Sequence, residues 1–210
     1  MRKSLTRMAA LTAAFALALP LGASGNGPLT GHAQAAEASV STAAKTLAAS
    51  STSTVRPATQ NFSVMVKGKE TKRKATLQQG KGYSLYVAAG YTFSAAKNKI
   101  YLTQYPSYQA KIEKLPAGYK LETLRKQGKA ELKKYGEVRS YIGDQLYESP
   151  MYNAKLFLQT SSKNNTTHNY IVWTSKTGES YLFRVTVPES EFAGTFTTII
   201  GTSLTSILAK

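Results

Sequence analysis

Few residue types in this chain could carry out catalysis. Acid–base and nucleophilic catalysis usually draws on His, Cys, Asp and Glu. The chain has no cysteine, and beyond residue 35 it has one histidine, His168, and one aspartate, Asp144. A serine triad would need both of them unless a glutamate replaced Asp144, and no serine lies in a G-x-S-x-G turn. We expect His168, beside a polar loop, to be a surface residue, and the sequence predicts no catalytic residue.

Carboxylates are sparse as well. The closest pair, Glu189 and Glu191, precedes an expected helix, where negative charge interacts favourably with the helix dipole. A metal site would need a cluster of His, Asp or Glu, and no glycine-rich nucleotide motif occurs. We therefore predict no metal and no cofactor. Glycoside hydrolysis needs only two carboxylates, so an extracellular carboxylate-based hydrolase stays the alternative function.

Positive charge is the most distinctive feature of the chain. There are 27 Lys and Arg against 11 Asp and Glu. Three of the cations and none of the acids lie in residues 1–35, which leaves 24 − 11 = +13 for the remainder. Such an excess attracts anionic partners, although it also favours solubility in general.

The cations gather in two clusters. One cluster surrounds a hairpin expected after residue 66, and the other lies along an expected helix. The alternative explanation of the helix cluster is an ordinary solvated helix face with a Glu122–Lys126 pair. Tyrosines at 101, 105, 108 and 119 would add stacking contacts, or simply belong to a half-buried sheet. The residues predicted to bind anions are Lys67, Lys69, Lys72, Arg73, Lys74, Lys126, Lys129 and Lys133.

The first 35 residues have the three parts of a secretory signal peptide. Arg2, Lys3 and Arg7 precede an uncharged apolar run over residues 8–23, and Ala33-Gln34-Ala35 fits the small-x-small pattern before a cut at Ala36. An uncleaved anchor is the alternative, but the run is short against the roughly 20 residues that span a bilayer. The segment resembles signal peptides of Gram-positive bacteria, and we expect a secreted or cell-wall-associated protein with no membrane span after processing.

Two regions follow the signal peptide. Residues 36–60 are rich in Ala, Ser and Thr and have no aromatic residue, so they cannot bury enough surface to offset their ordering entropy and should form a disordered stalk. Residues 61–210 are long enough for one domain with its own core.

Hydrophobic patterns predict the elements of this domain. Gln109, Lys111 and Glu113 alternate with apolar residues, which indicates a strand with one solvated face. Gly128 interrupts the first helix and favours close packing of helix on sheet over close approach to a ligand. Strands are expected at 62–66, 83–87, 91–93, 100–103, 108–113, 138–147, 154–160, 170–174 and 181–187, and helices at 121–135 and 192–208.

This order predicts an α+β fold in which helices flank a single antiparallel sheet. Two segments carry a family resemblance: Leu115-Pro116-Ala117-Gly118-Tyr119 with its helix, and Tyr181-Leu182-Phe183-Arg184-Val185-Thr186-Val187-Pro188 with its helix. They resemble the PsbP-like α/β/α sandwich over roughly residues 100–210, a layout also found in small secreted Gram-positive proteins. The resemblance implies a protein that binds partners and is not an enzyme, with no site motif to transfer.

The sequence thus favours an exported, non-enzymatic binding module. Its basic surface would engage an anionic cell-wall polymer or a protein at the cell surface, and nucleic acid is a less favoured partner. A structural or envelope-stress component is a third possibility that the residues do not separate from the first.

Overall fold

The computed structural model describes residues 55–66, 68–147 and 149–210. The predicted signal peptide, the predicted stalk up to residue 54, and Lys67 lie outside the described residues. In the part of the chain that is described, no helix has the length and apolar character needed to cross a bilayer.

Four antiparallel strands form the first sheet. They are β1 (Thr59–Val66), β2 (Lys69–Gly80), β3 (Tyr83–Ala88) and β11 (Leu208–Ala209), in the order β1-β2-β3-β11. In β2, Arg73 is opposite Phe62 of β1, and Ala75 is opposite Ala88 of β3. Phe62, Ala75 and Ala88 are buried, so this side of β2 faces the protein interior.

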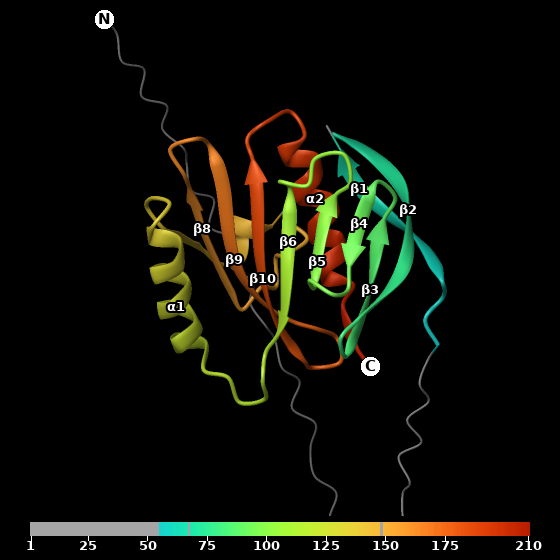
Figure 1. The fold of residues 1–210 in the computed structure, drawn as a ribbon, viewed down its shortest axis with the longest axis horizontal. Helices are drawn as coiled ribbons and strands as arrows, with labels where there is room; N and C mark the ends of the chain where they lie inside the picture. Colours follow the sequence, from blue (N-terminus) through green and yellow to red (C-terminus); the bar gives the residue numbers. More distant parts are fainter. Residues whose placement is uncertain (1–54, 67, 148) are drawn as a thin grey trace, which may run out of the picture. The chain divides into compact units, whose positions relative to one another are not determined.

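The second sheet has seven antiparallel strands and dominates the view in Figure 1. Its order is β4-β5-β6-β10-β9-β8-β7, which places β10 between β6 and β9. The strands are β4 (Tyr91–Ser94), β5 (Lys99–Leu102), β6 (Gln109–Lys114), β7 (Arg139–Tyr141), β8 (Leu156–Ser161), β9 (Thr166–Thr174) and β10 (Ser180–Pro188).

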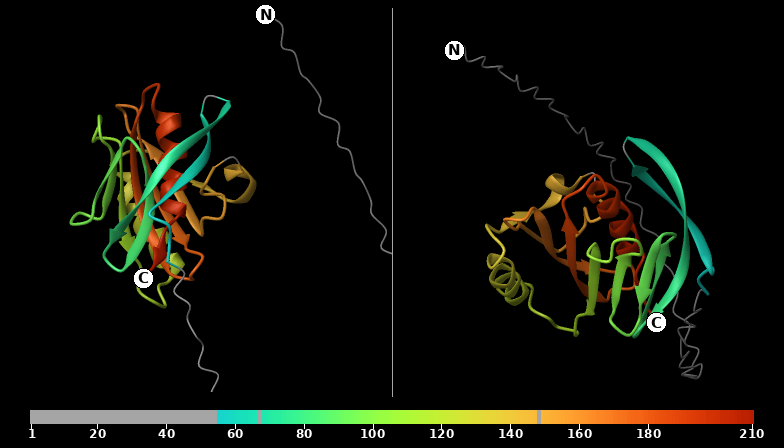
Figure 2. Two further views of the ribbon diagram at one scale, coloured as in Figure 1. Left: turned by 90° about the vertical axis from the view of Figure 1, so that its right-hand side faces the viewer. Right: turned by 45° about the horizontal axis from the view of Figure 1, so that its top comes forward.

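Helix α2 (Ala193–Thr205) lies between the two sheets, as Figure 2 shows. Ile199 packs with Phe62 and Val64 of the four-stranded sheet, whereas Ile200 packs in one cluster with Phe183 of the seven-stranded sheet. The apolar period of this segment therefore outweighs the weak helix propensity of its threonines, because the helix buries apolar residues against two layers.

Helix α1 (Leu121–Lys133) covers the opposite face of the seven-stranded sheet. Successive strand residues point to opposite faces, so Leu158 and Tyr170 pack under α1 while their neighbours in sequence face α2. Gly128 confirms the predicted close packing, since a Cβ there would lie 2.7 Å from the ring of Tyr170. The helix contacts β8 and β9, and the same face of β5, β6 and much of β10 stays uncovered.

The predicted fold class is wrong. The described residues are mostly β, in sheets of four and seven strands with two α-helices, and a single sheet flanked by helices is not what forms. The error lies chiefly in residues 69–80, for which the sequence predicts only a basic hairpin turn and no strand. This segment is instead a 12-residue strand that pairs with β1 and β3 and so creates the separate four-stranded sheet.

Two further elements differ from the prediction. The segment 138–147 forms only the short β7 and then the 3-10 helix η1 (Gly143–Leu146). The last helix ends at Thr205, and the residues after it form β11.

The predicted stalk boundary at residue 60 falls inside β1. Arg56 donates hydrogen bonds of 2.9 Å to Ser84 and of 2.7 Å to the carbonyl of Ser206, and its guanidinium lies 4.5 Å from the centre of the Tyr86 ring. These contacts join the chain before β1 to β3 and to the end of α2, so the described domain begins before Asn61.

Candidate functional site

A polar groove occupies the sheet surface that α1 leaves uncovered. Its floor is formed by β6, β10 and β9, and its wall by the last turn of α1. The pocket encloses about 220 Å³. The groove, as we call it below, is lined by Gln109, Lys111, Glu131, Leu132, Tyr135, His168, Asn169, Arg184, Val185 and Thr186.

Strand register places three cations in one row, of which Lys111 and Arg184 line the groove. Lys99 of β5 is opposite Lys111 of β6, and Lys111 is opposite Arg184 of β10. Directly opposed like charges destabilise a sheet. The row therefore carries an unfavourable charge interaction that a carboxylate or a bound anion would reduce.

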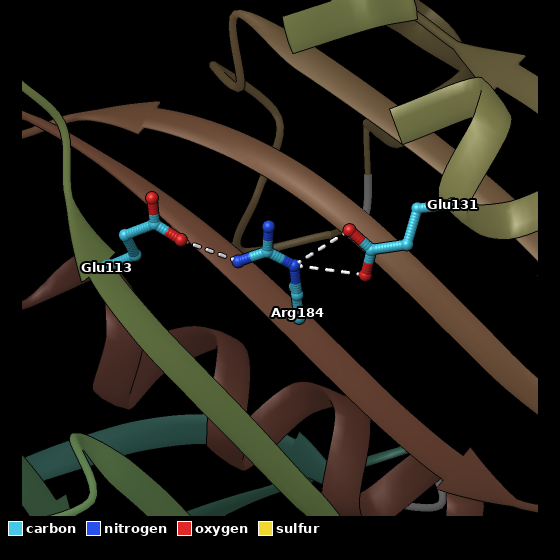
Figure 3. A network of polar contacts seen from close by, with 3 residues as sticks. All are labelled: Glu113, Glu131 and Arg184. Carbon is cyan, nitrogen blue, oxygen red and sulfur yellow. Dashed lines mark hydrogen bonds and ion pairs between the residues drawn. The ribbon is translucent and has the colours of Figure 1, made fainter. Parts of the chain in front are cut away.

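Two glutamates compensate one end of this row, as Figure 3 shows. The Nη1 of Arg184 donates to Glu113 at 2.7 Å, and its Nε donates to both carboxylate oxygens of Glu131 at 3.0 Å. Burial lowers the pKa of Arg184, but the hydrogen bonds to these two glutamates outweigh it and raise the pKa above its ordinary value. Arg184 is thus a fixed cation that ties β10 to β6 and to α1.

An aromatic pair forms the end of the groove. The rings of Tyr135 and His168 are stacked, with centroids 3.8 Å apart and planes 12° from parallel. Burial, and then the nearby Lys134 ammonium, lower the pKa of His168. At neutral pH the imidazole is consequently neutral and can both donate and accept a hydrogen bond.

The hairpin cluster predicted from sequence is divided between two faces of β2. Lys72 and Lys74 are exposed and pair with the exposed Ser63 and Asn61. Arg73 is half buried opposite Phe62, and its Nε is buried with no hydrogen-bond partner among the described residues. Lys69 is exposed at the start of β2, and Lys67 lies outside the described residues.

Arg73 faces the interior near Tyr91. Burial raises the pKa of Tyr91 to about 12, although the charge of Arg73 acts in the opposite direction. The structure therefore places Arg73 on the inward side of β2, whereas Lys69, Lys72 and Lys74 are exposed on this hairpin.

The helix cluster forms a continuous stripe. Lys126, Lys129 and Lys133 are all exposed, at spacings of three and four that place them on one side of α1. We call these three residues the α1 stripe. Glu131 is two positions from Lys129, roughly 200° around the helix, so the stripe and the groove lie on different sides of α1. Glu122 pairs with Arg125 at 3.2 Å. The solvated-face alternative predicts Lys126 as its partner instead.

The structure does not bring the two basic clusters together. The α1 stripe lies beyond one face of the seven-stranded sheet, whereas the hairpin lies beyond α2 on the other face. Figures 1 and 2 show α1 and the β1–β2 hairpin on opposite sides of the described domain. A single short ligand cannot reach both clusters.

The four tyrosines considered for stacking are also dispersed. Tyr101 lies beside the cation row, with the Nζ of Lys99 5.0 Å from its ring centre. Tyr105 stacks on Phe192 before α2, and Tyr108 is buried. Tyr119 packs at the start of α1. Only Tyr101 is next to a cation that faces the groove side of the sheet.

Sequence reasoning missed the residues that form the groove. One sign was present, because Arg184 is a charged residue in a mostly apolar strand. The predicted solvated face of 108–113 also supplies Gln109 and Lys111 of the lining, and Glu113 that bonds to Arg184. The pairing of β5 with β6, and of β6 with β10, has no local signal in the sequence. In the described part of the chain, no three His, Asp or Glu side chains gather to hold a metal ion.

One family model matches the chain. It is described as Domain of unknown function (DUF8580), and it matches residues 56–208. The chain belongs to this family. The match begins at Arg56 and ends within β11, so it includes both sheets, both helices and the groove. No curated protein matches the chain.

Proposed function

We propose that the processed protein is an exported, non-catalytic binding module whose α1 stripe contacts an anionic polymer of the cell wall. The observation that carries this proposal is the stripe itself. Its three lysines are exposed, and none of them forms an ion pair within the described residues. Like charges three and four positions apart destabilise a helix by a few tenths of a kcal/mol, and an anionic partner would relieve that cost.

The spacing of the stripe suits a polymer. Along a helix, consecutive stripe lysines are separated by about 4.5 Å and 6 Å of rise. A chain that carries repeated negative groups can contact all three in succession, whereas a single small anion cannot. Lys72 and Lys74 would then contact a different polymer strand, or none, because they lie on the other side of the described domain.

The groove supports binding more than hydrolysis. Glu113 and Glu131 are the carboxylates that face each other there, and the guanidinium of Arg184 fills the space between them. A glycosidase needs its two carboxylates on either side of the scissile bond. The resemblance to PsbP-type proteins stays a prediction, and the charge pattern favours binding without it.

Retention on isolated cell walls tests the proposal. We expect the protein to sediment with walls at about 0.1 M salt and to be released near 1 M, because screening shortens the Debye length from about 10 Å to 3 Å. Lys126→Gln, Lys129→Gln and Lys133→Gln together should abolish most retention. The charge-matched control, Lys81→Gln with Lys155→Gln and Lys176→Gln at exposed positions outside both basic clusters, should retain most of it. Circular dichroism melting confirms that each variant folds.

Two outcomes would contradict the proposal. Undiminished retention of the stripe variant would show that α1 is not the contact surface. Retention that survives 1 M salt would indicate a specific partner such as a surface protein. Export is tested separately by N-terminal sequencing of secreted protein, which should begin at Ala36.

A further inference from the structure

Lys111 of the groove and Lys99, just beyond the groove lining in β5, are a pair of cations without an ion-paired carboxylate among the described residues. Lys99 and Lys111 are directly opposite each other in β5 and β6, and neither forms an ion pair within the described residues. Arg184, the third cation in the row, is already bonded to Glu113 and Glu131. The Lys99–Lys111 pair therefore keeps an unfavourable charge interaction that a bound anion would convert into an attraction.

Polar uncharged groups lie next to this pair. A second row of residues lies two positions along the strands from the Lys99–Lys111–Arg184 row. In it, Gln109 is opposite Tyr101 on one side and Thr186 on the other, and Thr186 is opposite His168. This second row offers an amide, a hydroxyl and a neutral imidazole, which together donate and accept hydrogen bonds. Tyr135 adds an aromatic ring at the end of the groove.

The size and charge pattern of the groove restrict its ligand. A volume of about 220 Å³ is below the range of roughly 300–1,000 Å³ of sites for drug-sized molecules, so a single small unit fits. Glu113 of β6 and Glu131 of α1 are both bonded to Arg184 and place negative charge on either side of it. An anionic group is therefore repelled from Arg184 and its two glutamates and is best placed at the Lys99–Lys111 pair, with the uncharged part of the ligand against the second row.

We propose that the groove binds one small polyhydroxylated anion, a sugar acid or a polyol phosphate, with its anionic group at Lys99 and Lys111. Its hydroxyl groups bond to Gln109, Thr186 and His168. The groove is separated from the α1 stripe by the body of the helix, so it binds this unit whether or not the stripe holds a polymer.

Titration of the isotope-labelled protein, followed through backbone amide resonances, tests this site. The probes are D-glucuronate and glycerol phosphate, with D-glucose as the neutral control of the same shape as glucuronate. We expect at least one anion to shift amides of β6 and β10 near Lys111 and Arg184, and glucose to shift them much less. Binding of glucuronate alone would identify an acidic sugar as the source, and binding of glycerol phosphate alone a phosphate polymer.

Variants separate the site from general charge attraction. Lys111→Gln should weaken binding about tenfold, the usual effect of losing one charged hydrogen bond. Lys81→Gln, an exposed lysine in the β2–β3 turn, should leave it unchanged. The stripe variant should also bind the anion normally, even where it no longer sediments with walls, which separates failure of this site from failure of the proposed function.

Three results would overturn the site. They are the absence of groove shifts with both anions, equal binding of glucose and glucuronate, and normal binding by Lys111→Gln. Loss of anion binding in the stripe variant with normal binding in Lys111→Gln would likewise assign the anion to α1 and not to the groove.

Discussion

The Nε of Arg184 lies 3.0 Å from each carboxylate oxygen of Glu131 and joins the central strand β10 to helix α1. Both side chains are about one-third exposed, at 35% and 34%, so water partly screens the pair. The contact links the last turn of α1 to β10 at the wall of the groove.

Glu131→Gln should lower the free energy of unfolding by about 1 kcal/mol, because it removes a charged acceptor but leaves an amide oxygen in its place. Glu137→Gln is the control, since Glu137 is exposed and forms no ion pair within the described residues; its effect should stay within about 0.5 kcal/mol. Urea unfolding measures both. Equal effects of the two changes would show that the Arg184–Glu131 contact adds nothing to stability.

Gly128→Ala should destabilise the protein by about 1–3 kcal/mol. The new Cβ would lie 2.7 Å from Tyr170 and 2.9 Å from Leu158, which outweighs the gain in helix propensity. Gly194→Ala is the matched change in α2, where a Cβ meets nothing within 4 Å, and it should stabilise by up to about 1 kcal/mol. The denaturant midpoints of the two variants measure these changes in stability. A stabilised Gly128→Ala protein would mean that α1 can move away from the sheet.

Ile200→Ala should cost about 2–5 kcal/mol, the range for a buried isoleucine. Ile200 is 2% exposed in the cluster between the sheets. Thr197→Ala on the exposed side of the same helix should change stability by no more than about 0.5 kcal/mol. Thermal and urea unfolding measure both variants. If Ile200→Ala were as mild as Thr197→Ala, α2 would not be the central layer.

His168 should make stability depend on pH in one direction. Its pKa is lowered below the ordinary 6.5 by burial and then by Lys134, so the unfolded chain takes up this proton more readily than the folded protein. Stability therefore rises with pH between the two pKa values; the contribution is fully present above the unfolded pKa and is lost as the pH falls below it.

The change His168→Phe keeps a ring on Tyr135 and removes the titration. We expect the original protein to lose stability relative to this variant as the pH falls from about 7.5 to 5. Lys134→Gln should reduce that loss. Parallel pH profiles for the original protein and His168→Phe would contradict the assignment to His168.

Local patterns in the sequence identified most elements of the domain. Alternation located β1 and β6, and the period of apolar residues located both helices, because burial of one face imposes a spacing that neighbouring residues display. The same reasoning correctly placed Gln109, Lys111 and Glu113 on a solvated strand face. Strands were also predicted at β3 and β10, without that alternation. Absence of cysteine was likewise visible without a structure.

Only the tertiary structure decided how these elements meet. Lys99, Lys111 and Arg184 come from three strands whose register depends on pairing across the sheet, and no one of the three segments signals the other two. The sequence also could not show that residues 69–80 pair on both edges, or that α2 would be buried between two sheets. Strand pairing and layer packing depend on contacts between distant segments, whereas sequence periodicity reports only which side of each segment is buried.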